Sequence, residues 1–153
     1  LRMGYNIVLI EPEIHTNTGN IGRLSLATGS KLHLVKPFGF EITDKRLKRA
    51  GLDYWKYISL FIYENIDDFY AKNKDKKMVY LSSHGTKKHW DINFEDDLFL
   101  VFGKESSGLP KIITDNNQDK LYKIPLYSDK IRSLNVANAV SVVLYEGLRC
   151  LDS

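Results

Sequence analysis

The chain has 153 residues, of which 43% are hydrophobic and 27% are charged, and these values are ordinary for a globular protein with a real core. Its single cysteine excludes an internal disulfide and fits a reducing compartment, so we expect a cytoplasmic protein. No apolar run approaches a membrane span, no signal peptide pattern is present, and the net charge of +3 permits nucleic acid as a partner without requiring it.

The start of the chain and its histidines add two expectations. Residues 1–2 precede a methionine and resemble a remnant of cloning, so we expect one domain over residues 3–153. The four histidines are scattered and have only one cysteine beside them, which gives no metal-site spacing, and we expect no metal. His15 could touch a substrate, although a loop histidine is more often solvated, and we expect His84 and His89 to face water.

Short apolar runs alternate with helical patterns along the chain. In order, the expected strands are residues 5–10, 31–36, 59–63, 77–82, 98–102 and 122–126, and the expected helices are residues 18–28, 44–51, 66–72 and 136–145. Strands that are apolar throughout and alternate with helices indicate a parallel sheet covered on both faces. We therefore expect an α/β fold, whose ligands bind at the carboxyl ends of the strands.

The first of three polar stretches, residues 17–23 (NTGNIGR), follows the first strand and opens a helix. Backbone amides and the helix dipole favour an anion there, and the guanidinium of Arg23 suits a phosphate. Asn17 stands where a dinucleotide-binding fingerprint needs its first glycine, so this reading is weak. An ordinary helix cap, made by Asn17 or Thr18 and followed by a solvated arginine, is the alternative, and the residues favour neither.

The second stretch, residues 102–110 (FGKESSGLP), has the glycine spacing of a phosphate-binding loop. Leu109 and Pro110 occupy the positions where such a loop needs lysine and serine or threonine, which excludes a P-loop. What remains is a glycine-rich loop after a strand, with a plain turn as the alternative. The single acidic residue among small ones, Glu105, favours a functional loop.

The third stretch, residues 124–146, begins as a short strand, crosses a polar loop and ends in a helix that is apolar on nearly every side. Such a helix must be buried in a core or against a partner, and pairing with its own copy in a homodimer is a natural outcome. Ser133 and Asn135 lie where this helix starts, and backbone amides at that point can bind a ligand.

The expected helix over residues 44–51 is strongly basic and is followed by three aromatic residues. Its charges could bind an RNA backbone, and the rings could stack on a base. A solvated charged face is the alternative, and core packing is the expected role of at least one ring. The residues concerned are Lys45, Arg46, Lys48, Arg49, Tyr54, Trp55 and Tyr57.

Together the three stretches resemble the SPOUT class of RNA methyltransferases, whose three motifs follow one another in this order. The resemblance covers about residues 6–148 and is closest to the minimal, single-domain TrmL or YibK-like members. These are tRNA (cytidine/uridine) 2′-O-methyltransferases that act at the anticodon wobble position. The pieces EPEI and DKRLKRAGLDYW match this subfamily as well.

The resemblance implies S-adenosylmethionine as methyl donor and tRNA as substrate. It implies a homodimer with the active site at the subunit interface, and a mostly parallel sheet with a deep trefoil knot at the C-terminus. The cofactor-binding residues it implies are Leu81, Gly103, Gly108, Ile124, Ser133, Leu134 and Asn135. The catalytic residues it implies are Arg23, Asn17, Asn20, Glu105 and Tyr145, and we expect Arg23, Lys45, Arg46 and Arg49 to hold the RNA.

Arg23 matches the arginine of the family's first motif. Attack of a ribose 2′-hydroxyl on a methylsulfonium requires in-line placement and loss of a proton. Because an arginine stays protonated, we assign Arg23 to positioning and to stabilising the developing oxyanion, while an RNA phosphate could help to take the proton. Asn17, Asn20 and Glu105 would orient Arg23 and the ribose.

Three alternatives stay open. The same fold could act on ribosomal RNA or on another tRNA nucleotide. It could also be an RNA-binding protein without catalysis, which a lack of S-adenosylmethionine binding in calorimetry would favour. A nicotinamide oxidoreductase is more distant, because the first glycine of the fingerprint is missing.

Overall fold

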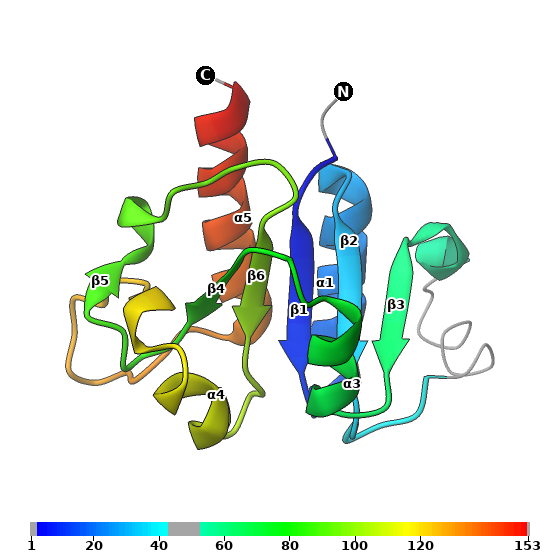
Figure 1. Ribbon diagram of the computed structural model, residues 1–153, viewed down its shortest axis with the longest axis horizontal. Coiled ribbons are helices and arrows are strands. Elements are labelled where there is room, and N and C mark those ends of the chain that lie inside the picture. Colours follow the sequence, from blue (N-terminus) through cyan, green and yellow to red (C-terminus); the bar gives the residue numbers. More distant parts are fainter. Residues whose placement is uncertain (1–2, 43–52, 153) are drawn as a thin grey trace.

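The computed structural model describes residues 3–42 and 53–152, and within them seven strands form one sheet (Figure 1). The strand order is β3-β2-β1-β6-β4-β7-β5, and neighbouring strands are parallel. The expected α/β class is confirmed. The strands are β1 Asn6–Ile10, β2 Lys31–Val35, β3 Leu60–Tyr63, β4 Met78–Leu81, β5 Lys87–Lys88, β6 Phe99–Phe102 and β7 Leu121–Lys123.

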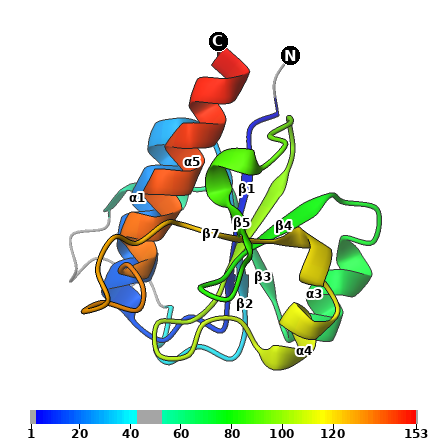
Figure 2. The same ribbon diagram turned by 90° about the vertical axis from the view of Figure 1, so that its left-hand side faces the viewer.

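Helices cover both faces of the sheet. Figure 2 shows α1 (His15–Thr28) and α5 (Val136–Asp152) side by side on one face, while α3 (Ile66–Lys72) and α4 (Lys111–Asp115) lie on the other. Short 3-10 helices are η1 Asp53–Tyr57, η2 His89–Asp91 and η3 Gln118–Lys120. The expected basic helix over residues 44–51 lies outside the described residues. No helix in the described part of the chain is long and apolar enough to cross a membrane.

The central strands are buried because they are apolar at successive positions. All five residues of β1 are buried, with Ile7 and Leu9 in the cluster that packs against α1 and α5. Val8 and Ile10 point the other way, into the cluster beneath α3 and α4. A strand with no polar face fits only between two helical layers, which is why the apolar runs predicted the architecture.

The end of the sheet that holds β4, β7 and β5 has an unusual order. β7 lies between β4 and β5, although it follows both in the chain. The backbone N–H of Ser82 donates to the carbonyl of Tyr122 at 2.9 Å, and a side chain at Gly85 would clash with the backbone of Tyr122 and Lys123. The segment between β4 and β5 therefore passes directly against β7. The deep trefoil knot at this end stays a prediction.

Several elements differ from the sequence-based expectation. β7 ends at Lys123 rather than at residue 126, since Pro125 has no N–H to pair. α1 begins at His15, before the two residues expected to cap it, and its first residues are instead held by another loop, as described below. His89 was expected to face water, but it is buried at the start of η2.

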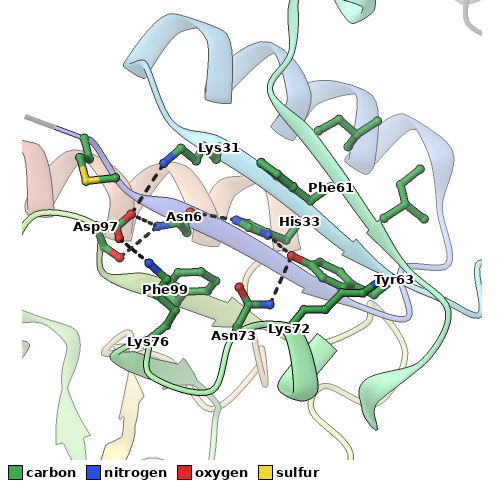
Figure 3. Close-up of a pocket in the computed structure, with 13 residues that line it drawn as sticks. Asn6, Lys31, His33, Phe61, Tyr63, Lys72, Asn73, Lys76, Asp97 and Phe99 are labelled. Carbon is green, nitrogen blue, oxygen red and sulfur yellow. Dashed lines mark hydrogen bonds and ion pairs between the residues drawn. The ribbon is translucent and has the colours of Figure 1, made fainter. Parts of the chain in front are cut away.

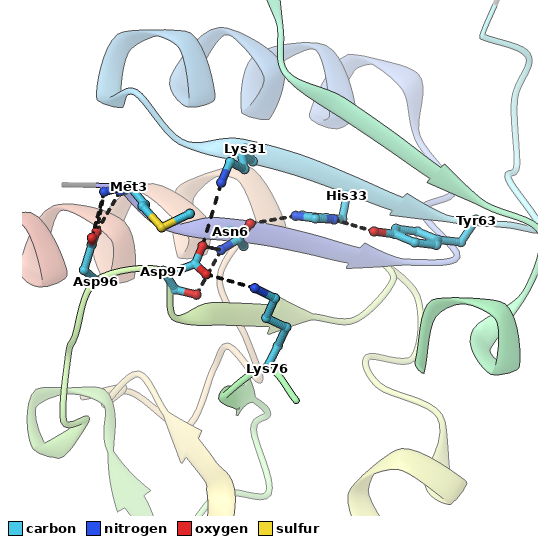
Figure 4. Close-up of polar contacts among 9 residues, drawn as sticks. Met3, Asn6, Lys31, His33, Tyr63, Lys76, Asp96 and Asp97 are labelled. Carbon is cyan, nitrogen blue, oxygen red and sulfur yellow. Dashed lines mark hydrogen bonds and ion pairs between the residues drawn. The ribbon is translucent and has the colours of Figure 1, made fainter. Parts of the chain in front are cut away.

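A buried polar chain crosses the face of the sheet beneath α3 (Figure 4). The amide nitrogen of Asn6 donates to the carbonyl and the carboxylate of Asp97, so its amide oxygen is free to accept from Nε2 of His33 at 2.8 Å. Nδ1 of His33 then accepts from the hydroxyl of Tyr63, also at 2.8 Å. This direction of donation requires a neutral imidazole.

The neutral state of His33 predicts a pH-dependent stability. Burial lowers the pKa of His33 from 6.5 to about 4. Between these two pKa values the imidazole is protonated in the unfolded chain but neutral in the folded chain. The free energy of unfolding should fall by roughly 2 kcal/mol between pH 7 and pH 5 because of this residue. Urea unfolding at both pH values would measure the change.

The matched pair of variants is His33→Gln and His84→Gln. The first should lose most of the pH dependence, with a remainder from His89, whose pKa burial also lowers. The second replaces an exposed histidine and should behave like the parent protein. An unchanged pH dependence in His33→Gln would contradict the assignment.

Candidate functional site

Three of the predicted cofactor-binding residues lie at neighbouring strand ends. Leu81 is the last residue of β4, and its register partners are Phe102 in β6 and Tyr122 in β7. Gly103 directly follows β6, and Ile124 directly follows β7. Because these strands are parallel and adjacent, Leu81, Gly103 and Ile124 share one edge of the sheet, the edge at which ligands bind in open α/β folds.

The loop after β6 folds back on itself between its two glycines. The N–H of Gly108 donates to the carbonyl of Lys104 at 2.9 Å, and Gly108 has a φ of 72°. A side chain at Gly103 would clash with the backbone of Gly108 and Leu109. Both glycines are therefore required by the fold of the loop itself, in addition to any approach of a ligand.

Glu105, at the tip of this loop, holds the segment that leads into α1. Its carboxylate accepts from the backbone N–H of Glu13 at 2.8 Å, from that of Ile14 at 3.2 Å and from the amide of Asn17 at 3.3 Å. Glu13 returns the contact by accepting from the N–H of Ser106 at 2.9 Å. Hydrogen bonds from the side chain and backbone of Ser106 hold the pKa of Glu13 below its usual value.

Asn17 continues the connection to the third polar stretch. It is buried in the first turn of α1, and its amide oxygen accepts from the amide nitrogen of Asn135 at 3.0 Å. The oxygen of Asn135 in turn accepts from the N–H groups of Ala137 and Asn138, at 2.8 and 3.2 Å, and so caps α5. Glu105, Asn17 and Asn135, one from each polar stretch, thus form a continuous chain of hydrogen bonds.

The cap on α5 gives a stability prediction. Asn135→Ala should lower the free energy of unfolding by about 1 kcal/mol, because two amides at the start of the helix lose their acceptor. Asn135→Ser should recover most of this loss, since serine also caps helices. Chemical denaturation would measure both, and an alanine variant as stable as the parent would show that the cap contributes nothing.

Arg23 and Asn20 are exposed on α1, one turn apart. The guanidinium of Arg23 lies over the ring of Tyr54, 5.8 Å from its centroid, and the hydroxyl of Tyr54 donates to the carbonyl of Gly19 at 3.2 Å. Burial raises the pKa of this hydroxyl, which keeps it protonated. Tyr54 therefore orients Arg23, a role that the sequence did not indicate beyond its aromatic character.

The remaining predicted residues are less closely gathered. Ser133 and Leu134 are exposed just before α5, and Tyr145 is exposed about 15 Å further along that helix. Tyr145 is therefore apart from Glu105, Asn17 and Asn135 within one chain. The three basic residues expected to hold RNA lie outside the described residues, and they are Lys45, Arg46 and Arg49.

The edge has the features that an adenosine-containing cofactor requires. Half-buried Ile124 and exposed Leu134 offer apolar surface on either side of the loop before α5. The hydroxyl of Thr18 is buried beside this edge and has no hydrogen-bond partner in the described part of the chain. Apolar walls with a few polar groups are typical of small-molecule sites.

Comparison with known proteins agrees with this geometry. Residues 4–145 match the model of the SpoU rRNA Methylase family. A tRNA (cytidine(34)-2′-O)-methyltransferase of Saccharophagus degradans is 45% identical over 148 residues, which are 96% of this chain and 96% of that protein.

Two solved structures have the same fold. The first, from work on the 2-OH methylation of C/U34 on tRNA, is 36% identical with a TM-score of 0.90, and covers 98% of this chain and 97% of its own. The second is the SpoU methyltransferase AviRb of Streptomyces viridochromogenes in complex with AdoMet. It is 21% identical with a TM-score of 0.85, and covers all of this chain and 60% of its own. The sequence match over most of its length shows that this chain belongs to the SpoU methylase family.

Proposed function

We propose that the protein transfers a methyl group from S-adenosylmethionine to the ribose 2′-hydroxyl of nucleotide 34, a cytidine or uridine, in the anticodon loop of tRNA. The observation that carries this proposal is the hydrogen-bonded chain Glu105–Asn17–Asn135, which joins the three polar stretches at the carboxyl edge of the sheet. The names of the relatives, which are similar over nearly their whole length, supply the substrate.

S-adenosylmethionine, when bound, supplies a methyl group activated by a positively charged sulfur. Leu81, Gly103, Ile124 and the residues before α5 would hold it, since they line the edge where three strands end. The first polar stretch, at the start of α1, is joined to this region by the hydrogen bonds of Asn17 to Glu105 and Asn135, so its side chains would lie close to a cofactor held here. Residues of the protein must then position the ribose of the RNA for the reaction.

Arg23 performs this placement in the proposed mechanism. It is exposed, permanently charged and backed by the ring of Tyr54, so its guanidinium can hold an RNA phosphate and the developing oxyanion of the 2′-hydroxyl. Asn20, one turn away, is free to contact the ribose. Glu105 acts indirectly: its bonds go to Asn17 and to the segment before α1, so it fixes the position of the helix that carries Arg23.

A homodimer is part of the proposal, and α5 supports it. The helix was expected to be buried all round, but within one chain only Val140, Val143, Leu144 and Gly147 are buried. The opposite face, with Asn138, Val142, Tyr145 and Arg149 at helical spacing, is exposed. A second copy packed on this face would cover Val142 and Tyr145, its two large apolar side chains, which are 40% and 52% exposed.

The same dimer would place Tyr145 at the active site. Within its own chain Tyr145 stands far along α5 from Asn135, so it can approach a reacting ribose only in a partner's site. We therefore propose an active site shared between the subunits. We also propose a single knotted domain that works in the cytoplasm, where tRNA is modified.

Incubation of unmodified tRNA with the protein and S-adenosylmethionine, followed by nucleoside mass spectrometry, tests the proposal. We expect 2′-O-methylcytidine or 2′-O-methyluridine to appear. Methylation confined to ribosomal RNA would favour the alternative substrate. Calorimetry distinguishes the non-catalytic alternative, since a protein that binds RNA but not S-adenosylmethionine cannot carry out this reaction.

A further inference from the structure

A pocket lies on the face of the sheet opposite α1, away from the site described above (Figure 3). It has a volume of about 520 Å³ and is formed by the start of β1, the first half of β2, the whole of β3, the end of α3 with the turn after it, and the start of β6. Small-molecule sites have volumes of ~300–1,000 Å³. α1, which carries Arg23, covers the opposite face of the sheet, so this pocket is a separate feature.

The floor of the pocket is aromatic and rigid. The rings of Phe61 and His33 are stacked at 4.8 Å with an interplanar angle of 15°, and the ring of Tyr63, whose hydroxyl bonds to the edge of the imidazole, lies nearly parallel to it at 5.9 Å. The hydrogen bonds of His33 to Asn6 and Tyr63 fix this row of rings. Phe61 is 43% exposed on the edge strand β3, so the row ends in an open aromatic surface on which a base could stack.

The rim of the pocket is basic. Lys31, Lys72 and Lys76 come from β2, α3 and the turn after α3, and Figure 3 shows them around the rings. Asp97 is the one acidic residue among the described residues of the lining, and it pairs with two of these lysines at once, Lys31 at 3.8 Å and Lys76 at 3.3 Å. Lys72 pairs with Asp68, which lies outside the lining, at 3.1 Å. Two carboxylates facing three ammonium groups leave one positive charge for an anion.

Further rings and basic residues lie in η1, which leads into the edge strand β3 and contacts Arg23. The cation–π contact of Arg23 with Tyr54 begins the series in η1. Lys56 and Tyr57 follow in the same 3-10 helix, with the ammonium 5.2 Å from a ring that is 70% exposed. β3 comes next and presents Phe61. Alternating rings and cations along a surface are typical of proteins that bind single-stranded nucleic acid.

We propose that this pocket binds an unpaired nucleotide of the RNA substrate, other than the one that is methylated, with its base on Phe61 and its phosphate among Lys31, Lys72 and Lys76. The RNA would run from Arg23 along η1 and over the edge strand. The inference rests on the proposed function for the class of ligand. It adds a second RNA-binding region, on the opposite face of the sheet from the helix that carries Arg23.

Binding of fluorescently labelled, full-length tRNA to the intact protein tests the proposal. Phe61→Ala should weaken binding about tenfold, the loss of one stacked base, without changing its salt dependence. Lys72→Ala combined with Lys76→Ala should weaken binding and lower the slope of log affinity against log salt by about 1 for each phosphate that the variant no longer binds. At saturating tRNA the rate of methyl transfer should stay near that of the parent protein, because neither change touches the reacting groups.

Two control variants separate the pocket from general effects. Phe61→Tyr keeps the ring and should bind tRNA like the parent protein, while the retained methyl transfer of Phe61→Ala at saturating tRNA excludes a folding defect in that variant. Lys74→Ala removes a charge from an exposed position in the same turn, outside the pocket lining, and should have no effect on affinity. An equal loss in Lys74→Ala would show a diffuse charge effect and overturn the proposal.

Two further results would count against the proposal. Unchanged tRNA affinity in Phe61→Ala and in the double lysine variant would overturn the proposal. So would tight binding of free cytidine monophosphate to the pocket together with unchanged tRNA affinity, which would assign it to a small ligand. Because binding is the readout, failure here leaves methyl transfer intact, whereas failure of the proposed function would appear as absent methylation by the parent protein.

Discussion

Replacement of Arg23 by alanine is expected to lower the rate of methyl transfer at least ~100-fold, the effect of removing one group that stabilises a developing oxyanion. The affinity for S-adenosylmethionine should change by less than about twofold, because Arg23 lies on α1 and not among the strand ends that we propose hold the cofactor. Stability should change little, since the side chain is exposed. Single-turnover kinetics with tRNA and calorimetry with the cofactor measure the two quantities.

Arg23→Lys is the informative companion to this variant. Lysine keeps the charge but lacks the planar fork, so we expect partial activity, between the alanine variant and the parent protein. Lys74→Ala, an exposed charge on the other side of the sheet, should be fully active. Full activity of Arg23→Ala would remove Arg23 from the mechanism and, with it, the assignment of the site.

The second large effect is expected at α5. Val142→Asp should convert the proposed dimer into monomers, because two-fold symmetry would place an unpaired carboxylate in the interface twice. At about 2 kcal/mol or more for each buried charge, the dissociation constant should rise at least ~1,000-fold. Methyl transfer should be lost with the dimer, since the proposed site needs Tyr145 of a second copy. Analytical ultracentrifugation and the methylation assay would show both losses.

The chain offers a closely matched control for this change. Ile112 on α4 is also a β-branched aliphatic residue, and it is 67% exposed, against 40% for Val142. Ile112→Asp should leave both the dimer and the activity intact. If Val142→Asp is monomeric but still active, the active site is not shared between subunits, whether or not the parent protein forms a dimer.

Much of the fold could be predicted from the sequence because the strands carry a simple signal. The residues of β6, and those of β1 after Asn6, are apolar at successive positions, which is typical of a strand buried on both faces. Gly29 ends α1 with a φ of 65°, as the position of a glycine after a helical pattern indicated. The family resemblance and the enzyme class were confirmed by the comparisons.

The strand order could not be predicted in the same way. Nothing local in residues 121–123 indicates that β7 enters between β4 and β5, because that position depends on contacts between distant segments. The bounds of β7 and α5 were also missed, since the end of each is set by tertiary context rather than by propensity. His89 was misjudged for the same reason: it occupies a polar loop in sequence, but that loop packs down against the sheet.

At the site, the residue types predicted which residues take part, but not which hydrogen bonds they make. Asn17, Glu105 and Asn135 were singled out, and the structure joins them. Their contacts were not predicted, because Glu105 accepts hydrogen bonds from the backbone of Glu13 and Ile14. Every residue has these backbone groups, so residue types do not indicate which of them will be bound. The same limit applies to the pocket at His33, whose lining comes from short strands and turns that are far apart in the chain.

The central claim, methylation of the 2′-hydroxyl of nucleotide 34, is tested most directly with tRNA that lacks this one oxygen. Two synthetic substrates would be compared, one with a 2′-deoxy nucleotide at position 34 and one with a 2′-deoxy nucleotide at position 32. We predict that transfer of labelled methyl from S-adenosylmethionine stops with the first substrate and proceeds normally with the second. Normal transfer to the tRNA that is deoxy at position 34 would contradict the account.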